Sequence, residues 1–147
     1  LVLIGGSPNP GEYESSIRST KDERVIFPGY VYGDDTNILM KNAYAYVQPS
    51  LIEGLSPVIL TVMGLATPLI CSDIVENKFI CGNNALTFIS GNSTDLAGQL
   101  EYSLNNYEEL QKKSTDGALD IKSRFNWDRI TDQYIDLLKK QKRKKHA

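Results

Sequence analysis

Short apolar runs alternate with segments of helical periodicity from the first residue almost to the last. The apolar runs are predicted to be strands at residues 1–4, 24–30, 45–49, 68–71 and 85–89. Helices are predicted at about residues 12–20, 35–43, 58–66, 94–105, 107–123 and 127–140, and residues 74–81 are either irregular or a short helix. Strands that alternate with helices build parallel β-α-β units. The predicted fold class is therefore α/β, with a parallel sheet flanked by helices.

Two apolar patterns stand out within these predicted elements. The run Leu1–Ile4 is entirely apolar, which is typical of a strand covered on both faces of a parallel sheet. On the helix predicted at 94–105, Leu96, Leu100 and Leu104 recur on one face.

Charge is distributed unevenly along the 147 residues. The formal net charge is −2, yet six lysines and arginines lie in the stretch 139–147, and no acid follows Asp136. The rest of the chain is therefore acidic, which argues against nucleic-acid binding, because that needs a basic face against the phosphates. The basic tail, residues 139–147, is predicted to be a solvated end of the chain. Weak contact with anionic lipid at the inner face of a membrane is the alternative.

Cysteine and histidine are too few for a metal site or a disulfide framework. Cys71 and Cys81 are expected to be small core residues, and His146 is expected to be solvated. This usage favours a reduced, cytoplasmic setting, and no metal or cofactor is predicted. No apolar run approaches the roughly 18 residues needed to cross a bilayer. Trp127 is expected to anchor the last helix by packing.

The clearest candidate site is the loop Ser50–Ser56, which precedes an apolar helix. It holds one acid, Glu53, beside Gly54, and Pro57 suits the first position of the helix. Ser56 is well placed to cap that helix. Free N–H groups and the positive end of the helix dipole both favour an anion, so the backbone amides of residues 54–56 are predicted to meet a phosphate group.

Two further loops follow predicted strands and are expected to lie near the first. They are Gly5-Gly6 and Gly29–Val31. Ligands of open parallel sheets bind beyond the carboxyl ends of the strands, so the three loops are predicted to share one edge and one site.

Four segments, in order, carry a resemblance to a known family. They are residues 25–31, residues 46–54 (similar to a "PS-x-x-EG" segment), residues 63–73 (similar to "AMAxGxPVIxSD") and residues 125–127. In these segments the chain resembles the carboxyl-terminal domain of the retaining group 1 glycosyltransferases, which have the GT-B fold and use nucleotide-sugar donors. The resemblance implies a Rossmann-like parallel sheet that forms one half of a GT-B architecture. Residues 1–138 would be the nucleotide-sugar-binding domain without its first β-α unit, and residues 139–147 the basic tail.

The family motif is a glutamate, seven residues and a second glutamate. The resemblance implies that Glu53, the first, contacts the hydroxyls of the donor sugar and is the catalytic candidate. It implies donor contacts for Gly5, Gly6, Tyr30, Val31, Ser50, Gly54, Leu55, Ser56 and Thr61, with the base near Val31.

Two residues depart from the family pattern. Thr61 stands where the second glutamate would hold the ribose, and Phe79 stands where the family usually carries a glutamate. A threonine hydroxyl can still hydrogen-bond, but losing the charge-assisted bond is expected to weaken donor binding by about 1–3 kcal/mol. Thr61 is expected to be buried, or to have its hydroxyl braced by a carbonyl of its own helix.

The resemblance also implies groups that this chain is not expected to contain. A preceding strand and helix would supply an arginine and a lysine for the diphosphate, and an amino-terminal domain would bind a sugar or a lipid-linked acceptor. The chain alone is therefore predicted to be inactive. Two alternatives stay open: a non-catalytic GT-B-like binding or scaffold domain, and a nucleotide-sugar epimerase of the same architecture.

Overall fold

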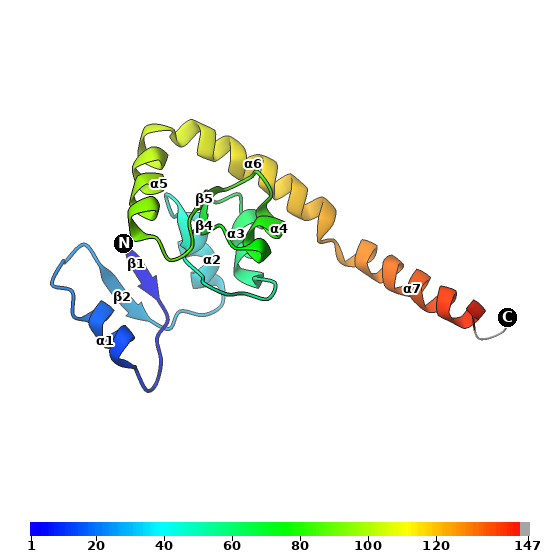
Figure 1. Ribbon diagram of the computed structural model, residues 1–147, viewed down its shortest axis with the longest axis horizontal. Helices are drawn as coiled ribbons and strands as arrows, with labels where there is room; N and C mark the ends of the chain where they lie inside the picture. The colour runs from blue at the N-terminus through cyan, green and yellow to red at the C-terminus, as the bar shows by residue number, and fades with distance from the viewer. Residues whose placement is uncertain (145–147) are drawn as a thin grey trace. The chain divides into compact units, whose positions relative to one another are not determined.

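The computed structural model describes residues 1–144, with side chains through residue 140, and every predicted strand and helix is present in the predicted order (Figure 1). The chain divides into two compact units, the first Leu1–Leu39 and the second beginning at Met40. Residues 74–81, for which two predictions stood open, contain a short helix.

The first unit is a parallel strand pair with one helix between the strands. Its elements are β1 (Val2–Ile4), α1 (Glu12–Arg18) and β2 (Ile26–Gly29), and α2 (Asp34–Lys41) carries the chain into the second unit. The prediction that Leu1–Ile4 is covered on both faces is wrong, because Val2 is 47% exposed and Ile4 is 41% exposed. Two short strands and one polar helix have too little apolar surface to cover a sheet twice.

The second unit is built on three parallel strands in the order β3-β4-β5, namely β3 (Tyr46–Gln48), β4 (Leu69–Ser72) and β5 (Leu86–Phe88). Its helices are α3 (Pro57–Gly64), α4 (Val75–Cys81), α5 (Ser93–Asn105), α6 (Tyr107–Arg124) and α7 (Trp127–Lys144). All four residues of the central strand β4 are buried.

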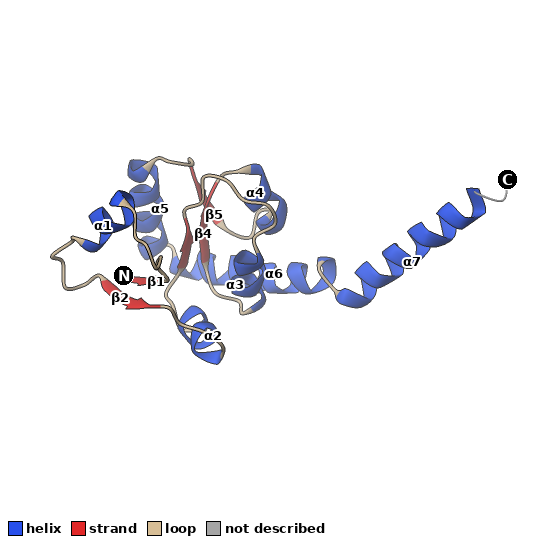
Figure 2. Cartoon of the chain, turned by 90° about the horizontal axis from the view of Figure 1, so that it is seen from below, coloured by secondary structure: helices blue, strands red, loops and turns tan. Residues whose placement is uncertain are grey.

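Helices cover both faces of this sheet (Figure 2). Successive strand residues point to opposite faces, and β4 accordingly contributes Leu69 and Cys71 to a cluster with α3, α4 and α6. Ile70 belongs to the second cluster, with β5 and Leu110 of α6, and Leu96 of α5 packs against it. The register of the sheet therefore decides which helix each strand residue meets.

One prediction about packing is wrong, and one pattern is only partly used. Trp127, expected to anchor the last helix by packing, is 81% exposed. The leucines that recur on one face of α5 differ in burial: Leu96 packs on the core, whereas Leu100 is 39% exposed and Leu104 is 68% exposed.

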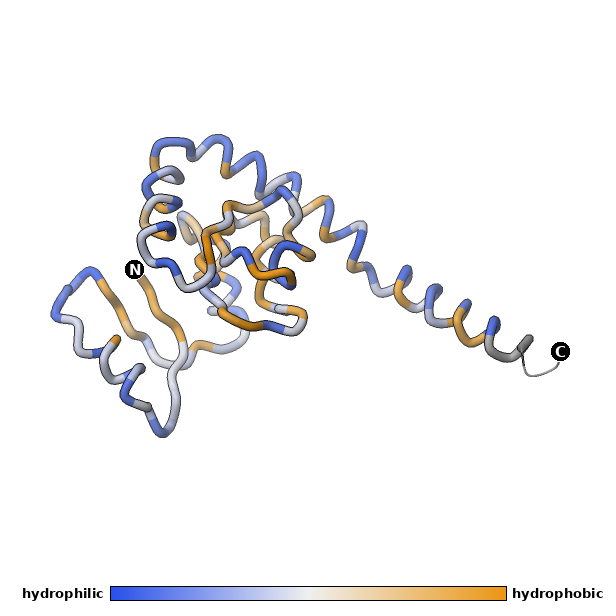
Figure 3. Tube along the Cα trace, viewed as in Figure 1, coloured by the Kyte–Doolittle hydropathy of each residue, from blue (hydrophilic) through white to orange (hydrophobic). Residues whose placement is uncertain are grey.

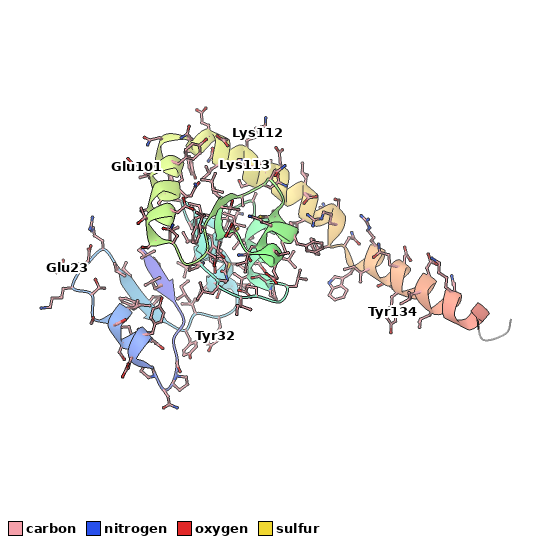
Figure 4. All side chains as sticks on the ribbon, viewed as in Figure 1. Glu23, Tyr32, Glu101, Lys112, Lys113 and Tyr134 are labelled. Atoms are coloured by element: carbon pink, nitrogen blue, oxygen red, sulfur yellow. The ribbon has the colours of Figure 1, made fainter. Side chains whose placement is uncertain are left out.

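The last helix α7 continues into the basic segment, as far as Lys144. Apolar residues recur along it (Figure 3), and Tyr134 projects from it into solvent at 63% exposure (Figure 4). Lys145 and His146 lie outside the described residues, and lipid contact by the tail stays a prediction. Among the helices of residues 1–144, none is both long and apolar enough to traverse a bilayer.

One residue has a backbone conformation that its side chain disfavours. Ala66, just after α3, has a φ of 54° and donates its N–H to the carbonyl of Met63 at 2.9 Å. Residues other than glycine are destabilised by about 1–2 kcal/mol in this left-handed region. The family segment similar to residues 63–73 has its glycine at this position, so the chain bears a local strain there.

Replacing Ala66 by glycine should relieve that strain. We expect Ala66→Gly to raise the free energy of unfolding by about 0.5–1 kcal/mol, since relief of strain exceeds the extra entropy of the unfolded glycine. Urea unfolding measures the change. The control is Ala97→Gly, at an exposed position inside α5, which should destabilise by about 1 kcal/mol. A loss of stability in both variants would contradict the prediction.

Candidate functional site

Glu53 is held by two side chains at the carboxyl end of β3. Its Oε1 accepts a hydrogen bond from the Ser50 hydroxyl at 2.7 Å and another from Gln48 Nε2 at 3.0 Å. Gln48 Nε2 also donates to Ser50 Oγ at 2.8 Å. The carboxylate therefore has a defined orientation although it lies in a loop.

Tyr46 on β3 extends this group of side chains. Its hydroxyl donates to Gln48 Oε1 at 3.2 Å, and its ring is partly buried. Burial raises the pKa of Tyr46, and the negative charge of Glu53 raises it further. The pKa of the Tyr46 phenol is therefore expected to change if the Glu53 carboxylate moves.

The backbone of the loop is tied to the neighbouring strand ends. Ser72, the last residue of β4, donates its hydroxyl to the carbonyl of Ser50, and Ser90, after β5, donates to the same oxygen at 3.4 Å. Asn77 of α4 donates from Nδ2 to Ser72 Oγ at 3.0 Å and to the Ser72 carbonyl at 3.1 Å. Within the second unit, the carboxyl ends of all three strands thus meet at one edge.

An ion pair lies at the same edge. Asp73 accepts from the N–H of Ser90 at 3.0 Å and pairs with Lys78 at 3.2 Å. The Ser90 N–H, and after it Lys78, lower the pKa of Asp73. This pair ties the end of β4 to α4 and to the residues that follow β5.

The start of α3 can receive an anion. Ser56 is at the N-cap and Pro57 at the first helical position, as predicted, but Ser56 is buried and its hydroxyl makes no capping bond, so that part of the prediction is wrong. The first turn also holds no acidic residue. The first N–H groups of a helix have no partner within it, but Pro57 has no N–H and Ile59 is fully buried, so the half-buried Val58 carries the first helical amide that a ligand can approach. No acid within the first turn offsets the dipole there.

Gly54 is not required by the geometry of the loop. Its φ is not in the left-handed region, and a Cβ built on it would meet nothing within 4 Å. The residue is exposed, as is Leu55 at 49%. Glycine at position 54 therefore leaves open space beside Glu53.

The two residues that depart from the family pattern are both exposed. Thr61 is therefore not buried, but its hydroxyl donates to the carbonyl of Pro57 at 3.0 Å, which confirms that its own helix braces it. Phe79 is 62% exposed, and the centre of its ring lies 5.6 Å from the guanidinium carbon of Arg124. Nη2 of Arg124 also donates to the Phe79 carbonyl.

The predicted residues of the first unit lie at the carboxyl ends of β1 and β2. The Tyr30 hydroxyl donates to the carbonyl of Gly6, and the Gly5 N–H donates to the carbonyl of Gly29 at 2.7 Å. Gly6 has a φ of 153°, a backbone conformation that favours glycine, whereas the Arg18 side chain, 2.7 Å from a Cβ placed there, could move aside.

The base contact that the resemblance implies in this unit stays a prediction. The Val31 carbonyl accepts from the Thr36 hydroxyl at 2.9 Å. Tyr30 stacks on Tyr32 with 5.9 Å between ring centroids. Both tyrosine rings are exposed, so the unit offers an aromatic surface next to Val31.

Neither cysteine belongs to the edge with Glu53. Cys71 and Cys81 are free and buried, as predicted, with their sulfurs 4.0 Å apart. The hydrogen bond between them and then burial raise the pKa of Cys71. Across residues 1–144, no three His, Cys, Asp or Glu side chains gather closely enough to hold a metal ion.

Several residues of this edge were not found from the sequence. They are Gln48, Ser72, Asn77 and Ser90, and each owes its position to strand register or to a contact between elements. Gln48, Ser72 and Ser90 each lie at or just after the end of a strand. That shared place was the only signal that could have pointed to them.

Comparison with known proteins decides the family. The family model described as "Glycosyl transferases group 1" matches residues 1–106. The chain belongs to the group 1 glycosyltransferases. O-antigen chain mannosyltransferase B of Escherichia coli is 25% identical over 122 residues, which are 83% of this chain and 32% of that protein. An uncharacterized glycosyltransferase of Methanocaldococcus jannaschii is also 25% identical, over 94% of this chain and 36% of its own length. The chain thus spans about a third of these two relatives.

Solved structures show the same fold for this glycosyltransferase chain. Sucrose-phosphate synthase of Thermosynechococcus elongatus superimposes with a TM-score of 0.82 at 21% identity, over 95% of this chain and 38% of that one. Anabaena HepE, solved in complex with UDP-glucose, gives a TM-score of 0.80 at 18% identity, over 95% and 40% respectively. The Rossmann-like α/β architecture of GT-B proteins is thereby confirmed.

The titration of Tyr46 tests the geometry around Glu53. We expect Glu53→Gln to lower the pKa of Tyr46 toward its ordinary value of about 10, because the neutral amide no longer opposes the phenolate. Absorbance near 295 nm, compared with the same scan of Tyr46→Phe, isolates this phenol. Since the folded pKa is raised, the unfolded chain loses the proton first, and stability from this group declines as the pH rises above about 10.

The matched control is Glu101→Gln. Glu101 lies exposed on α5 (Figure 4) and should leave the Tyr46 titration unchanged. If Glu53→Gln shifts the titration no more than this control does, the two groups are not adjacent in solution.

Proposed function

We propose that this chain is the nucleotide-sugar-binding part of a glycosyltransferase, in which Glu53 orients the donor sugar. The observation that carries the proposal is the position of Glu53: a carboxylate held through Oε1 by Ser50 and Gln48, a few residues before the uncapped start of α3. One structural relative was solved with UDP-glucose and another relative is named a mannosyltransferase, and both names support a nucleotide-sugar donor.

The two ends of such a donor suit the two parts of this loop. The diphosphate is an anion, which the positive dipole end of α3 favours, and the first turn of that helix holds no acid. The sugar hydroxyls are neutral donors, for which the carboxylate is the stronger class of acceptor. With Oε1 engaged, we assign the sugar contact to Oε2 of Glu53. The open space beside Gly54 gives the donor room to approach the backbone.

The complete reaction needs groups beyond this chain. We propose that an acceptor hydroxyl attacks the anomeric carbon while the diphosphate leaves, with retention of configuration as the family resemblance implies. Sugar transfer builds charge on the leaving diphosphate, and electrostatic stabilisation of such charge is usually the largest catalytic effect. A UDP-, GDP- or ADP-linked sugar is the proposed donor, and the chain by itself is proposed to bind the donor without transferring the sugar.

Substitution of Glu53 should weaken binding of the sugar and not of the diphosphate. Calorimetric titration with UDP-glucose, GDP-mannose and ADP-glucose, each paired with its nucleoside diphosphate, first identifies the base. For the bound pair, we expect Glu53→Gln to lower affinity for the nucleotide sugar by about 1.5–3 kcal/mol and to leave the diphosphate within a few-fold. Glu101→Gln is again the control. Equal losses for sugar and diphosphate forms, or no binding by the parent chain, would refute the proposal.

A non-catalytic relative is the second candidate, favoured by the state of Thr61. Its hydroxyl donates to its own helix, so it provides no charged acceptor where the family holds the ribose. If the chain is a working donor domain, we expect Thr61→Glu to tighten binding of the nucleoside diphosphate by about 1–3 kcal/mol, through a charge-assisted bond to the ribose. The same titrations measure this change. Absence of binding in both the parent chain and this variant would favour the non-catalytic alternative.

A further inference from the structure

Two fully buried polar side chains lie behind the Glu53 loop. Ser72 at the end of β4 and Asn77 on α4 are both 0% exposed. Buried polar groups normally satisfy each other by hydrogen bonds, so the direction of each bond shows what such a group holds in place.

The bond directions lead from Asn77 toward the loop. The amide nitrogen of Asn77 donates to Ser72 Oγ and to the Ser72 carbonyl. Because Ser72 Oγ accepts this bond, its single proton is free to be donated, and it goes to the carbonyl of Ser50. Ser50 in turn donates its own hydroxyl to Glu53. The series therefore ends on the carboxylate.

The oxygen of the Asn77 amide shows that its donor side matters. Among the described residues, Oδ1 has no hydrogen-bond partner although it is buried. An unpaired buried acceptor is destabilising. An apolar side chain at this position would avoid that cost. We therefore take the role of the Asn77 amide to be the two hydrogen bonds that its nitrogen donates to Ser72.

Packing does little to hold the loop in place. Leu51 is 68% exposed, Ile52 is 87% exposed and Leu55 is 49% exposed, so the apolar residues on either side of Glu53 do not bury it. The other tie to the Ser50 carbonyl, from Ser90, is long at 3.4 Å. Gln48 holds the side chains of Ser50 and Glu53, and the hydrogen bond from Ser72 is the shorter of the two ties on the Ser50 carbonyl.

We propose that Ser72 and Asn77 are positioning residues for Glu53: Asn77 orients the Ser72 hydroxyl, which fixes the Ser50 backbone and thereby the carboxylate. The sugar contact itself rests on the proposed function above. The positioning of Glu53 does not, because it can be measured without any ligand.

The ligand-free test is the titration of Tyr46 in Ser72→Ala. If the loop is released, the carboxylate moves away from the phenol, and the pKa of Tyr46 falls as it does in Glu53→Gln. The matched control is Ser114→Ala, another buried serine, which donates to the Gln111 carbonyl within α6 and should leave the titration unchanged. A Tyr46 pKa that stays at the parent value in Ser72→Ala overturns the proposal.

Asn77→Leu provides a second variant, which keeps the branched shape of the side chain, is somewhat larger, and removes the amide. It is expected to lower the pKa of Tyr46 in the same direction as Ser72→Ala, and it decides the matter if Ser72→Ala does not fold. An unchanged Tyr46 pKa in this variant overturns the role assigned to Asn77. Thermal unfolding of all the variants checks that each titration is made on folded protein.

The ligand test uses the same three nucleotide-sugar pairs as above. In Ser72→Ala, we expect the preference for nucleotide sugar over nucleoside diphosphate to fall about two- to tenfold, the effect of one lost neutral hydrogen bond. Equal weakening of both ligands would contradict a role through Glu53. If the parent chain binds none of the probes, the donor function fails while the Tyr46 titration still decides the positioning of Glu53.

Discussion

Parallel pairing of β3, β4 and β5 is the constraint on which the candidate site depends. Because β4 is buried along its whole length between two paired strands, the register places Gln48 opposite Cys71 and Ser72 opposite Phe88. The ends of the strands are thereby aligned, and short polar side chains that follow them can reach one another. For this reason the carbonyl oxygen of Ser50 accepts hydrogen bonds from two residues far away in sequence, Ser72 and Ser90.

The order of the elements and the place of Glu53 could be predicted from the sequence, because both are local patterns. Apolar runs, helical spacing and the loop before Pro57 each depend on residues close together in the chain. The more distant supports of the loop could not be predicted, since Ser72 reaches the Ser50 carbonyl, and Asn77 reaches Ser72, through contacts between elements. Burial was predicted wrongly at Trp127 and Val2. An apolar side chain favours burial, but whether it is buried depends on which other elements pack over it.

The chemistry of the edge is divided between a carboxylate and an uncompensated helix start. Glu53 is a charged acceptor whose orientation is set by neutral donors, and α3 presents positive potential with no acid in its first turn. These opposite potentials lie within a few residues of each other. A ligand with a diphosphate at one end and hydroxyls at the other matches both, which neither a simple sugar nor inorganic phosphate does.

The uncapped start of α3 also has a consequence for stability, because an anion bound there would stabilise the folded chain. A helix whose first turn lacks both a capping side chain and an acid forgoes stabilisation that an anion could provide. By mass action, a ligand that binds only the folded chain adds RT ln(1 + [L]/Kd) to its stability, about 2.7 kcal/mol at a hundredfold excess over Kd. For any anion that binds at this helix start, the stability of the domain would therefore rise with the concentration of that anion.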